Sequence, residues 1–138
     1  MELAPSIDEI RYVYELRAEK MNNPAMLSLG SSAIGKNYCE TTINVSAEGN
    51  VKYCGTFGDN LIIGNVRHKN ILDIWEENKE KLVCPKPKGP CAICANSSFC
   101  YGCRANAFYF TGDEKNSDPT CWLNPDARLV YEKYLRRP

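Results

Sequence analysis

Residues 91–103 read Cys-Ala-Ile-Cys-Ala-Asn-Ser-Ser-Phe-Cys-Tyr-Gly-Cys, which places four cysteines in the spacing C-x2-C-x5-C-x2-C. Each C-x2-C turn can point two sulfurs to the same side, so the four thiols can converge on a metal centre. Three further cysteines flank this stretch: Cys39 and Cys54 before it, and Cys121 after it. Seven thiols exceed the four ligands of one tetrahedral ion, so the pattern indicates more than one metal centre.

The composition is that of one small folded domain in which metal centres supply part of the folding free energy. The chain has 138 residues, 9 glycines and 8 prolines, which indicates much irregular backbone. Lysine and arginine number 17, as do aspartate and glutamate, so the formal net charge is zero. This balance argues against a nucleic-acid binder and against a polybasic membrane binder. No stretch reaches the length of a membrane span.

Eight cysteines could instead form the disulfide framework of a secreted protein. Residues 1–30, however, lack the apolar core of a signal peptide. Tandem C-x2-C units are also typical of metal ligands rather than of disulfide frameworks. We therefore expect a reducing, cytoplasmic setting.

The local patterns predict an α+β fold, a small metal-cluster-dependent domain with a β-hairpin, short helices and cysteine-rich loops. Ser6 and Glu9 fit a capping box that starts the first helix, and Gly49 supplies the positive φ of the hairpin turn. The predicted elements are a helix at 7–21, a loop at 27–38, hairpin strands at 42–45 and 51–53, and helices at 71–82, 103–111 and from 125 onward.

Several side-chain positions follow from the same patterns. Ile10, Val13, Tyr14 and Arg17 are expected to share the packed face of the first helix, with Val130 and Leu135 docking the last. The aromatic run 108–110 is expected to lie in the core. Because an antiparallel hairpin brings its open ends together, Cys39 and Cys54 are expected to reach one centre there.

Zinc and iron–sulfur clusters are the two metal centres that such a cysteine set can hold. A zinc ribbon usually has a long gap between its two C-x2-C knuckles, whereas Cys94 and Cys100 here are separated by five residues. A single zinc site also leaves the outer cysteines without a role. The one histidine, His68, lies between two cationic residues, which disfavours a second metal dication there. A cubane is wider than one ion and can draw its ligands from scattered segments, so the spacing favours iron–sulfur clusters.

The chain resembles the SPASM domain, the C-terminal auxiliary-cluster module of many radical S-adenosylmethionine enzymes. The family pattern is a cysteine, nine to fifteen residues, a glycine, four residues and a cysteine, which Cys39, Gly49 and Cys54 reproduce. It continues with C-x2-C-x5-C at 91–100, a cysteine near Cys103 and a last one at Cys121. The runs at 100–105, 111–113 and 118–121 also resemble family signatures.

The resemblance implies two iron–sulfur clusters of the [4Fe-4S] type and assigns their ligands. Auxiliary cluster II would take four cysteines: Cys91, Cys94, Cys100 and Cys121. Auxiliary cluster I would take three cysteines: Cys39, Cys54 and Cys103. Residues 31–38 contain no cysteine, so cluster I would either keep an open iron or recruit Cys84, which is extra relative to the pattern. Zinc could substitute in these sites.

The resemblance also implies a function and partners. The module would serve electron transfer and substrate positioning for a peptide or protein substrate, as in peptide natural-product maturation. The C-x3-C-x2-C triad that cleaves S-adenosylmethionine is missing, so catalysis would need the barrel domain of a parent enzyme. The implied divisions are an N-terminal helix and loop at 1–38, the SPASM-like domain at 39–123 and a docking helix at 124–138. Two alternatives remain: a structural zinc module and a metal-held peptide-recognition domain.

Overall fold

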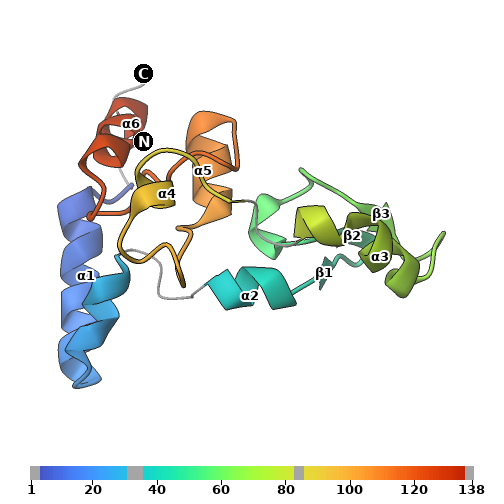
Figure 1. The fold of residues 1–138 in the computed structure, drawn as a ribbon, viewed down its shortest axis with the longest axis horizontal. Coiled ribbons are helices and arrows are strands. Elements are labelled where there is room, and N and C mark those ends of the chain that lie inside the picture. The colour runs from blue at the N-terminus through green and yellow to red at the C-terminus, as the bar shows by residue number, and fades with distance from the viewer. Residues whose placement is uncertain (1–3, 31–35, 83–85, 136–138) are drawn as a thin grey trace. The chain divides into compact units, whose positions relative to one another are not determined.

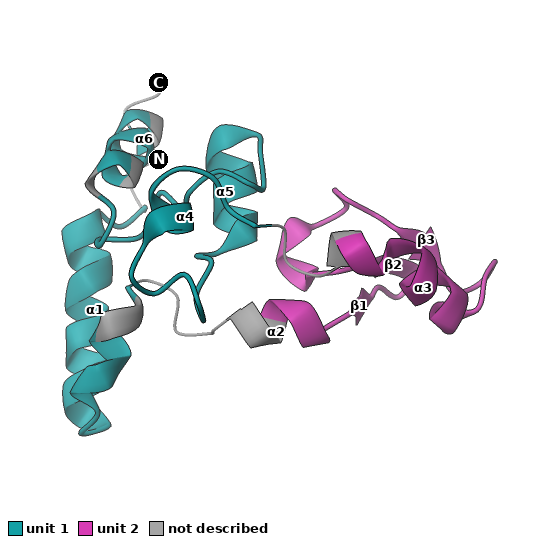
Figure 2. Cartoon of the chain, viewed as in Figure 1, with its two compact units in different colours: residues 1–35, 86–138 teal, residues 36–85 magenta. Residues whose placement is uncertain are grey.

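The computed structural model describes residues 4–30, 36–82 and 86–135 (Figure 1). The chain forms two compact units, residues 1–35 with 86–138 and residues 36–85 (Figure 2). The elements in chain order are α1 (Ile7–Lys20), η1 (Pro24–Leu29), α2 (Lys36–Thr41), β1 (Asn44–Val45), β2 (Asn50–Lys52), η2 (Gly55–Phe57), β3 (Gly64–Asn65), α3 (Ile71–Leu82), α4 (Pro90–Ile93), α5 (Arg104–Thr111) and α6 (Pro125–Leu135).

Helix α1 begins at the predicted capping box. The Ser6 hydroxyl accepts from the Glu9 backbone N–H at 3.2 Å, and the Glu9 carboxylate accepts from the Ser6 backbone N–H at 2.7 Å. The predicted packed face was partly wrong, because Val13 is 60% exposed while Ile7 and Ala18 are buried. Ile7 and Ala18 lie on one face of α1, and this buried face is next to the predicted face that contains Val13.

The unit of residues 36–85 is built on a three-stranded antiparallel sheet in the order β1-β2-β3. Val51 on the central strand is fully buried, as are Phe57 of η2 and Ile74 of α3. A Cβ on Gly64 of β3 would lie 2.9 Å from Ile74, so the missing side chain lets α3 approach the sheet. A small antiparallel sheet with several short helices confirms the predicted α+β class.

The predicted loop at 27–38 was wrong at both ends. Residues up to Leu29 continue the 3₁₀ helix η1, and α2 begins at Lys36. Cys39 therefore lies on α2 rather than at the open end of the hairpin. The hairpin itself is confirmed, with Gly49 at φ +87° in its turn and Val45 paired with Val51.

Helices α5 and α6 pack together in the other unit. Gly112 ends α5 in the left-handed conformation, and its N–H donates to the Phe108 carbonyl. Tyr131 anchors α6: its ring lies 5.0 Å from that of Phe110, and its hydroxyl donates to the Pro5 carbonyl at 2.6 Å. The predicted docking by Val130 was wrong, because Val130 is 40% exposed, and the aromatic run 108–110 is core only in part.

Two further observations concern the chain as a whole. The divisions at 1–38, 39–123 and 124–138 stay a prediction, because compactness alone does not define where a domain of this family begins or ends. Among the described residues, no helix combines the length and the apolar character that crossing a bilayer would require.

Candidate iron–sulfur centre

The structure places five of the predicted ligands in the unit that contains residues 86–138. Cys91 lies on α4, Cys94 ends that helix, and Cys103 directly precedes α5. Two others, Cys39 and Cys54, belong to the unit of residues 36–85. Cys84 lies outside the described residues.

The seven described cysteines, from Cys39 to Cys121, form no disulfide with one another. Within residues 4–30, 36–82 and 86–135, no three histidine, cysteine, aspartate or glutamate side chains are grouped as a ligand set for one metal ion. The structural evidence for a site therefore comes from the hydrogen bonds and close contacts that hold the cysteine-bearing loops in place.

Gly102 lies close to the sulfur atoms of two candidate ligands, Cys91 and Cys100. Its backbone N–H donates to Cys100 Sγ at 3.4 Å. A Cβ added to Gly102 would lie 3.4 Å from Cys91 Sγ and 2.6 Å from the Asp118 Cβ, and its φ of +69° is one that glycine adopts most readily. Glycine at this position lets the two sulfur-bearing segments approach each other closely.

Asp118 ties the last cysteine to the cysteine-rich loop. Its carboxylate is fully buried and accepts from the Cys103 backbone N–H at 2.8 Å. The other carboxylate oxygen accepts from the Thr120 backbone N–H and hydroxyl at 2.9 and 2.7 Å. The Cys121 N–H donates to the Asp118 carbonyl at 3.4 Å. Asp118 thus holds the backbone at Cys103 through its side chain and the backbone at Cys121 through its own carbonyl.

Arg104 is buried at 3% exposure. Its guanidinium donates to the backbone carbonyls of Glu114 and Asn116 at 2.9 and 2.7 Å, and also to that of Tyr101. Only the planar fork of an arginine can reach several carbonyls in this way. Arg104 therefore holds the loop after α5 against the loop before it, and places a cation beside the cysteines.

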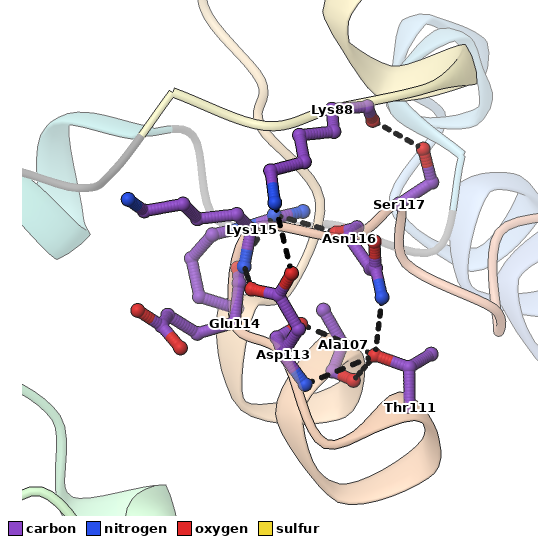
Figure 3. Close-up of polar contacts among 9 residues, drawn as sticks. Lys88, Ala107, Thr111, Asp113, Glu114, Lys115, Asn116 and Ser117 are labelled. Atoms are coloured by element: carbon purple, nitrogen blue, oxygen red, sulfur yellow. Dashed lines mark hydrogen bonds and ion pairs between the residues drawn. The ribbon is translucent and has the colours of Figure 1, made fainter.

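The turn at 111–117 joins this loop to the segment that leads into Cys91 (Figure 3). The Thr111 hydroxyl donates to the Ala107 carbonyl at 2.6 Å. The Ser117 hydroxyl donates to the Lys88 carbonyl at 2.8 Å and accepts from the Cys91 N–H at 2.9 Å. The first ligand of the C-x2-C pair is thereby held by a turn well beyond it in sequence.

Asp113 is the charged residue of this turn. Its carboxylate accepts from the Lys115 backbone N–H at 2.8 Å and from the Lys88 ammonium at 3.1 Å (Figure 3). The Lys115 N–H, followed by the Lys88 ammonium, lowers the pKa of Asp113 below its usual value.

The N-terminal segment packs against Cys121 and its neighbour. The rings of Tyr14 and Trp122 meet edge to face at 5.1 Å. Burial raises the pKa of Tyr14, and the negative charges of Asp118 and Cys103 raise it further. A Cβ on Gly30 would lie 2.5 Å from Cys121 Sγ, so only a glycine fits against that sulfur.

In the other unit, Cys54 lies two residues after β2 and is the N-cap of η2. Its Sγ lies 2.8 Å from the Thr56 hydroxyl. Cys39, on α2, is half-buried, as is Cys54. Both side chains are accessible to a cofactor.

The surroundings fit a sulfur-ligated cluster. Cys91 Sγ receives the side-chain N–H of Asn124 at 3.3 Å, and Cys100 Sγ receives the Gly102 N–H. Such donors stabilise thiolates and the bridging sulfides of a cluster, both of which are anionic. A donor set made of thiols selects iron–sulfur clusters or zinc rather than hard cations.

Sequence reasoning missed the roles of several residues around these sulfurs. Asp118 was noted only as part of the family signature at 118–121. An aspartate side chain that accepts from the backbone N–H two residues later nevertheless forms a common local turn. Asn124 directly precedes the last predicted helix, and that position alone gave no sign of its contact with Cys91. Nothing in the local pattern near Gly30 indicated that it contacts a cysteine far along the chain.

Residues 38–104 match the model of the SPASM iron–sulfur cluster-binding domain. Cys121 and Asn124 lie beyond the matched segment.

Two AdoMet-dependent heme synthases and a PqqA peptide cyclase are similar in sequence. The heme synthase of Methanosarcina barkeri (strain Fusaro) is 38% identical over 84 residues, which are 59% of this chain and 24% of that protein. The peptide cyclase of Methylocella silvestris is 32% identical over 95 residues, 64% of this chain and 26% of that protein. The heme synthase of Nitratidesulfovibrio vulgaris (strain Hildenborough) is 31% identical over 84 residues, 59% of this chain and 22% of that protein.

The chain therefore spans about a quarter of the length of the curated relatives it matches. The matched segment contains six of the seven assigned ligands and the candidate ligand Cys84, together with the Gly102 and Arg104 positions. Residues 38–104 of this chain are therefore similar to the SPASM family of iron–sulfur cluster-binding domains.

Proposed function

We propose that this chain holds two [4Fe-4S] clusters as the auxiliary-cluster module of a radical S-adenosylmethionine enzyme. One observation carries the proposal: five cysteines, Cys91 to Cys121, lie on segments that Asp118, Arg104 and Ser117 hold together within one unit. These residues join the C-x2-C-x5-C-x2-C loop to the later segment that bears Cys121. The family match to an iron–sulfur domain supports the same reading.

In this proposal Cys91, Cys94, Cys100 and Cys121 ligate cluster II. Asn124 and Gly102 support this set by donating N–H groups to two of its sulfurs. Cys39, Cys54 and Cys103 ligate cluster I, and Cys84 is the candidate fourth ligand. The alternative for cluster I is an open iron that could bind a substrate thiol.

When bound, the clusters would accept or relay an electron for the parent enzyme. The chain's own residues set the conditions for this. Arg104 supplies a buried positive charge, and Asp118 fixes the backbone at two ligands. The hydrogen bonds of Gly102 to Cys100 and of Cys103 to Asp118 limit the movement of the cluster ligands, which favours electron transfer with little rearrangement.

We propose a peptide or protein substrate, a radical S-adenosylmethionine barrel as the partner domain, and a cytoplasmic setting. The similarity to a protein named PqqA peptide cyclase supports the substrate class. The similarity to two AdoMet-dependent heme synthases supports dependence of the parent enzyme on S-adenosylmethionine.

Anaerobic reconstitution with iron and sulfide, followed by metal and acid-labile sulfide analysis, tests the cofactor assignment. Two cubane clusters give about eight irons and about eight sulfides per chain, with spin-resonance signals after reduction. Zinc bound without sulfide would contradict the proposal and support a structural zinc module.

Two cysteine variants test the ligand assignment. Cys94→Ala should lose about half of the iron and sulfide, because it removes one thiolate of cluster II. Cys84→Ala is the matched control and should keep most of the iron if Cys84 is a bystander. Equal loss from both variants would make Cys84 a ligand.

A further inference from the structure

Asn124 and Cys91 form a buried contact between the C-terminal segment and the cysteine-rich loop. Asn124 is 6% exposed and Cys91 is 5% exposed. The side-chain nitrogen of Asn124 lies 3.3 Å from Cys91 Sγ, and the two residues are 33 positions apart. Asn124 lies beyond the residues that match the family model, so the match assigns it no role.

Chemistry fixes the direction of this hydrogen bond once Cys91 is a ligand. A metal-bound thiolate carries no proton, so its sulfur can only accept. The amide NH₂ of Asn124 must then face the sulfur, since its carbonyl oxygen would repel the anion. Burial of both groups strengthens the bond, because the local dielectric constant is low.

The backbone of Asn124 is held on both sides, which positions the donor in advance. Its N–H donates to the Cys121 carbonyl at 3.1 Å, and its carbonyl accepts from the Arg128 N–H at 3.2 Å in the first turn of α6. Helix α6 is in turn anchored through Tyr131 and Phe110. The side chain is therefore fixed by both a candidate ligand and a docked helix.

We infer that Asn124 is a positioning residue that sets the reduction potential of cluster II through its hydrogen bond to Cys91. This rests on the proposed function. Reduction adds negative charge to a cluster, and an N–H aimed at a ligand sulfur stabilises the reduced form more than the oxidised form. Asn124 thus raises the potential of cluster II and leaves that of cluster I unchanged.

Redox titration of the reconstituted chain, followed by spin resonance, tests this inference. Asn124→Leu keeps a similar volume and removes the donor without adding charge. It should keep iron and sulfide, and lower the equilibrium constant for one-electron reduction of one cluster about tenfold, which is about 59 mV. Leu129→Ala is the matched control on α6, because Leu129 is 67% exposed and its truncation should leave both potentials unchanged. Equal potentials in Asn124→Leu and wild type would overturn the inference.

A second measurement detects the hydrogen bond directly in the wild-type protein. Wild-type protein that carries ¹⁵N only in asparagine side-chain amides should show a ¹⁵N coupling to a reduced cluster in pulsed spin resonance. Asn124→Leu should lose that coupling. If the variant cannot retain iron, the wild-type result decides, and a loaded wild type without the coupling overturns the inference. A wild type that binds no iron or sulfide contradicts the proposed function instead, so the two failures are distinguishable.

Discussion

At the scale of single residues, two glycines give the candidate ligands their space. Gly102 lies between Cys100 and Cys91, and Gly30 lies against Cys121. In both places a methyl group would occupy the volume beside a sulfur. Such close approach of backbone to ligand is a use of glycine that composition alone does not reveal.

Gly30→Ala should therefore displace Cys121 and reduce the iron content of the reconstituted chain by about half, because one ligand of cluster II is lost. Gly112→Ala is the matched control. Gly112 also has a positive φ, +80°, but nothing lies within 4 Å of its added Cβ. Gly112→Ala should lose about 1–2 kcal/mol, because Gly112 is in the left-handed helical region, and it should keep its iron. Gly30, at φ +60° and ψ −146°, lies in a region that is essentially restricted to glycine, so Gly30→Ala should lose more stability and should also lose iron. Full iron content in Gly30→Ala would show that Cys121 does not need this space.

Arg104 presents a different kind of residue-scale constraint. Arg104→Lys should lower the free energy of unfolding by at least about 2 kcal/mol, because an ammonium cannot replace the planar fork that reaches several carbonyls. The measurement is urea unfolding of the reconstituted protein. Arg11→Lys is the control on the exposed face of α1, where the ion pair with Glu15 contributes little. A similar stability loss in both variants would contradict the structural role of Arg104.

At the scale of elements, the turn at 111–117 fastens α5 to the segment that leads into Cys91. Thr111 closes the end of the helix, Asp113 holds the turn, and Ser117 reaches the ligand segment (Figure 3). These bonds link a turn and a loop with little regular structure between them. Protonation of the Asp113 carboxylate at low pH can therefore weaken this turn without any reaction at the cysteine sulfurs.

The lowered pKa of Asp113 predicts the direction of this acid effect. The folded state favours the carboxylate, so its contribution is present above the unfolded pKa and is lost as the pH falls through the folded pKa. Wild type should be more stable than Asp113→Asn at neutral pH, and the difference should shrink as the pH is lowered below about 4. Urea midpoints of the two proteins across this range provide the measurement.

Lys88→Met separates the two causes of this shift. This substitution removes the Lys88 ammonium, the weaker cause of the lowered pKa, and leaves the Lys115 N–H in place. It should therefore reproduce only part of the stability loss caused by Asp113→Asn. A difference between wild type and Asp113→Asn that stays constant with pH would show that Asp113 acts without its charge.

At the scale of the whole molecule, the cofactor is expected to supply much of the folding free energy. Each compact unit has a small core, with Val51, Phe57 and Ile74 fully buried in one and Ile7 nearly so in the other. Small cores of this kind leave a limited margin of stability. Cluster binding adds to that margin, because it favours the folded state alone.

Removal of iron by a chelator should therefore lower the melting temperature by more than about 10 °C. Circular dichroism of the reconstituted protein before and after chelation provides the measurement. Cys94→Ala, with one cluster fewer, should show a smaller drop. An unchanged melting temperature would mean that the fold is stable without the clusters and that cluster binding adds nothing to its stability.

Local sequence signals predicted much of this protein. The cysteine spacing favoured iron–sulfur chemistry and carried the resemblance to the SPASM domain, because C-x2-C turns are short-range geometry. The capping box at Ser6 and the turn at Gly49 also lie within a few residues of the groups they serve. The packed face of α1 was harder to predict, since Val13 and Ile7 are both apolar and only their neighbours decide which is buried.

The tertiary structure alone decided how the ligand loops are held. Asn124 meets Cys91 across 33 positions, and Asp118 meets Cys103 across 15. The burial of Arg104 and the contact of Gly30 with Cys121 are of the same kind. The periodicity and spacing of a sequence record which groups are near along the chain. A contact between distant segments depends on how the whole backbone packs, and so it becomes visible only in the folded protein.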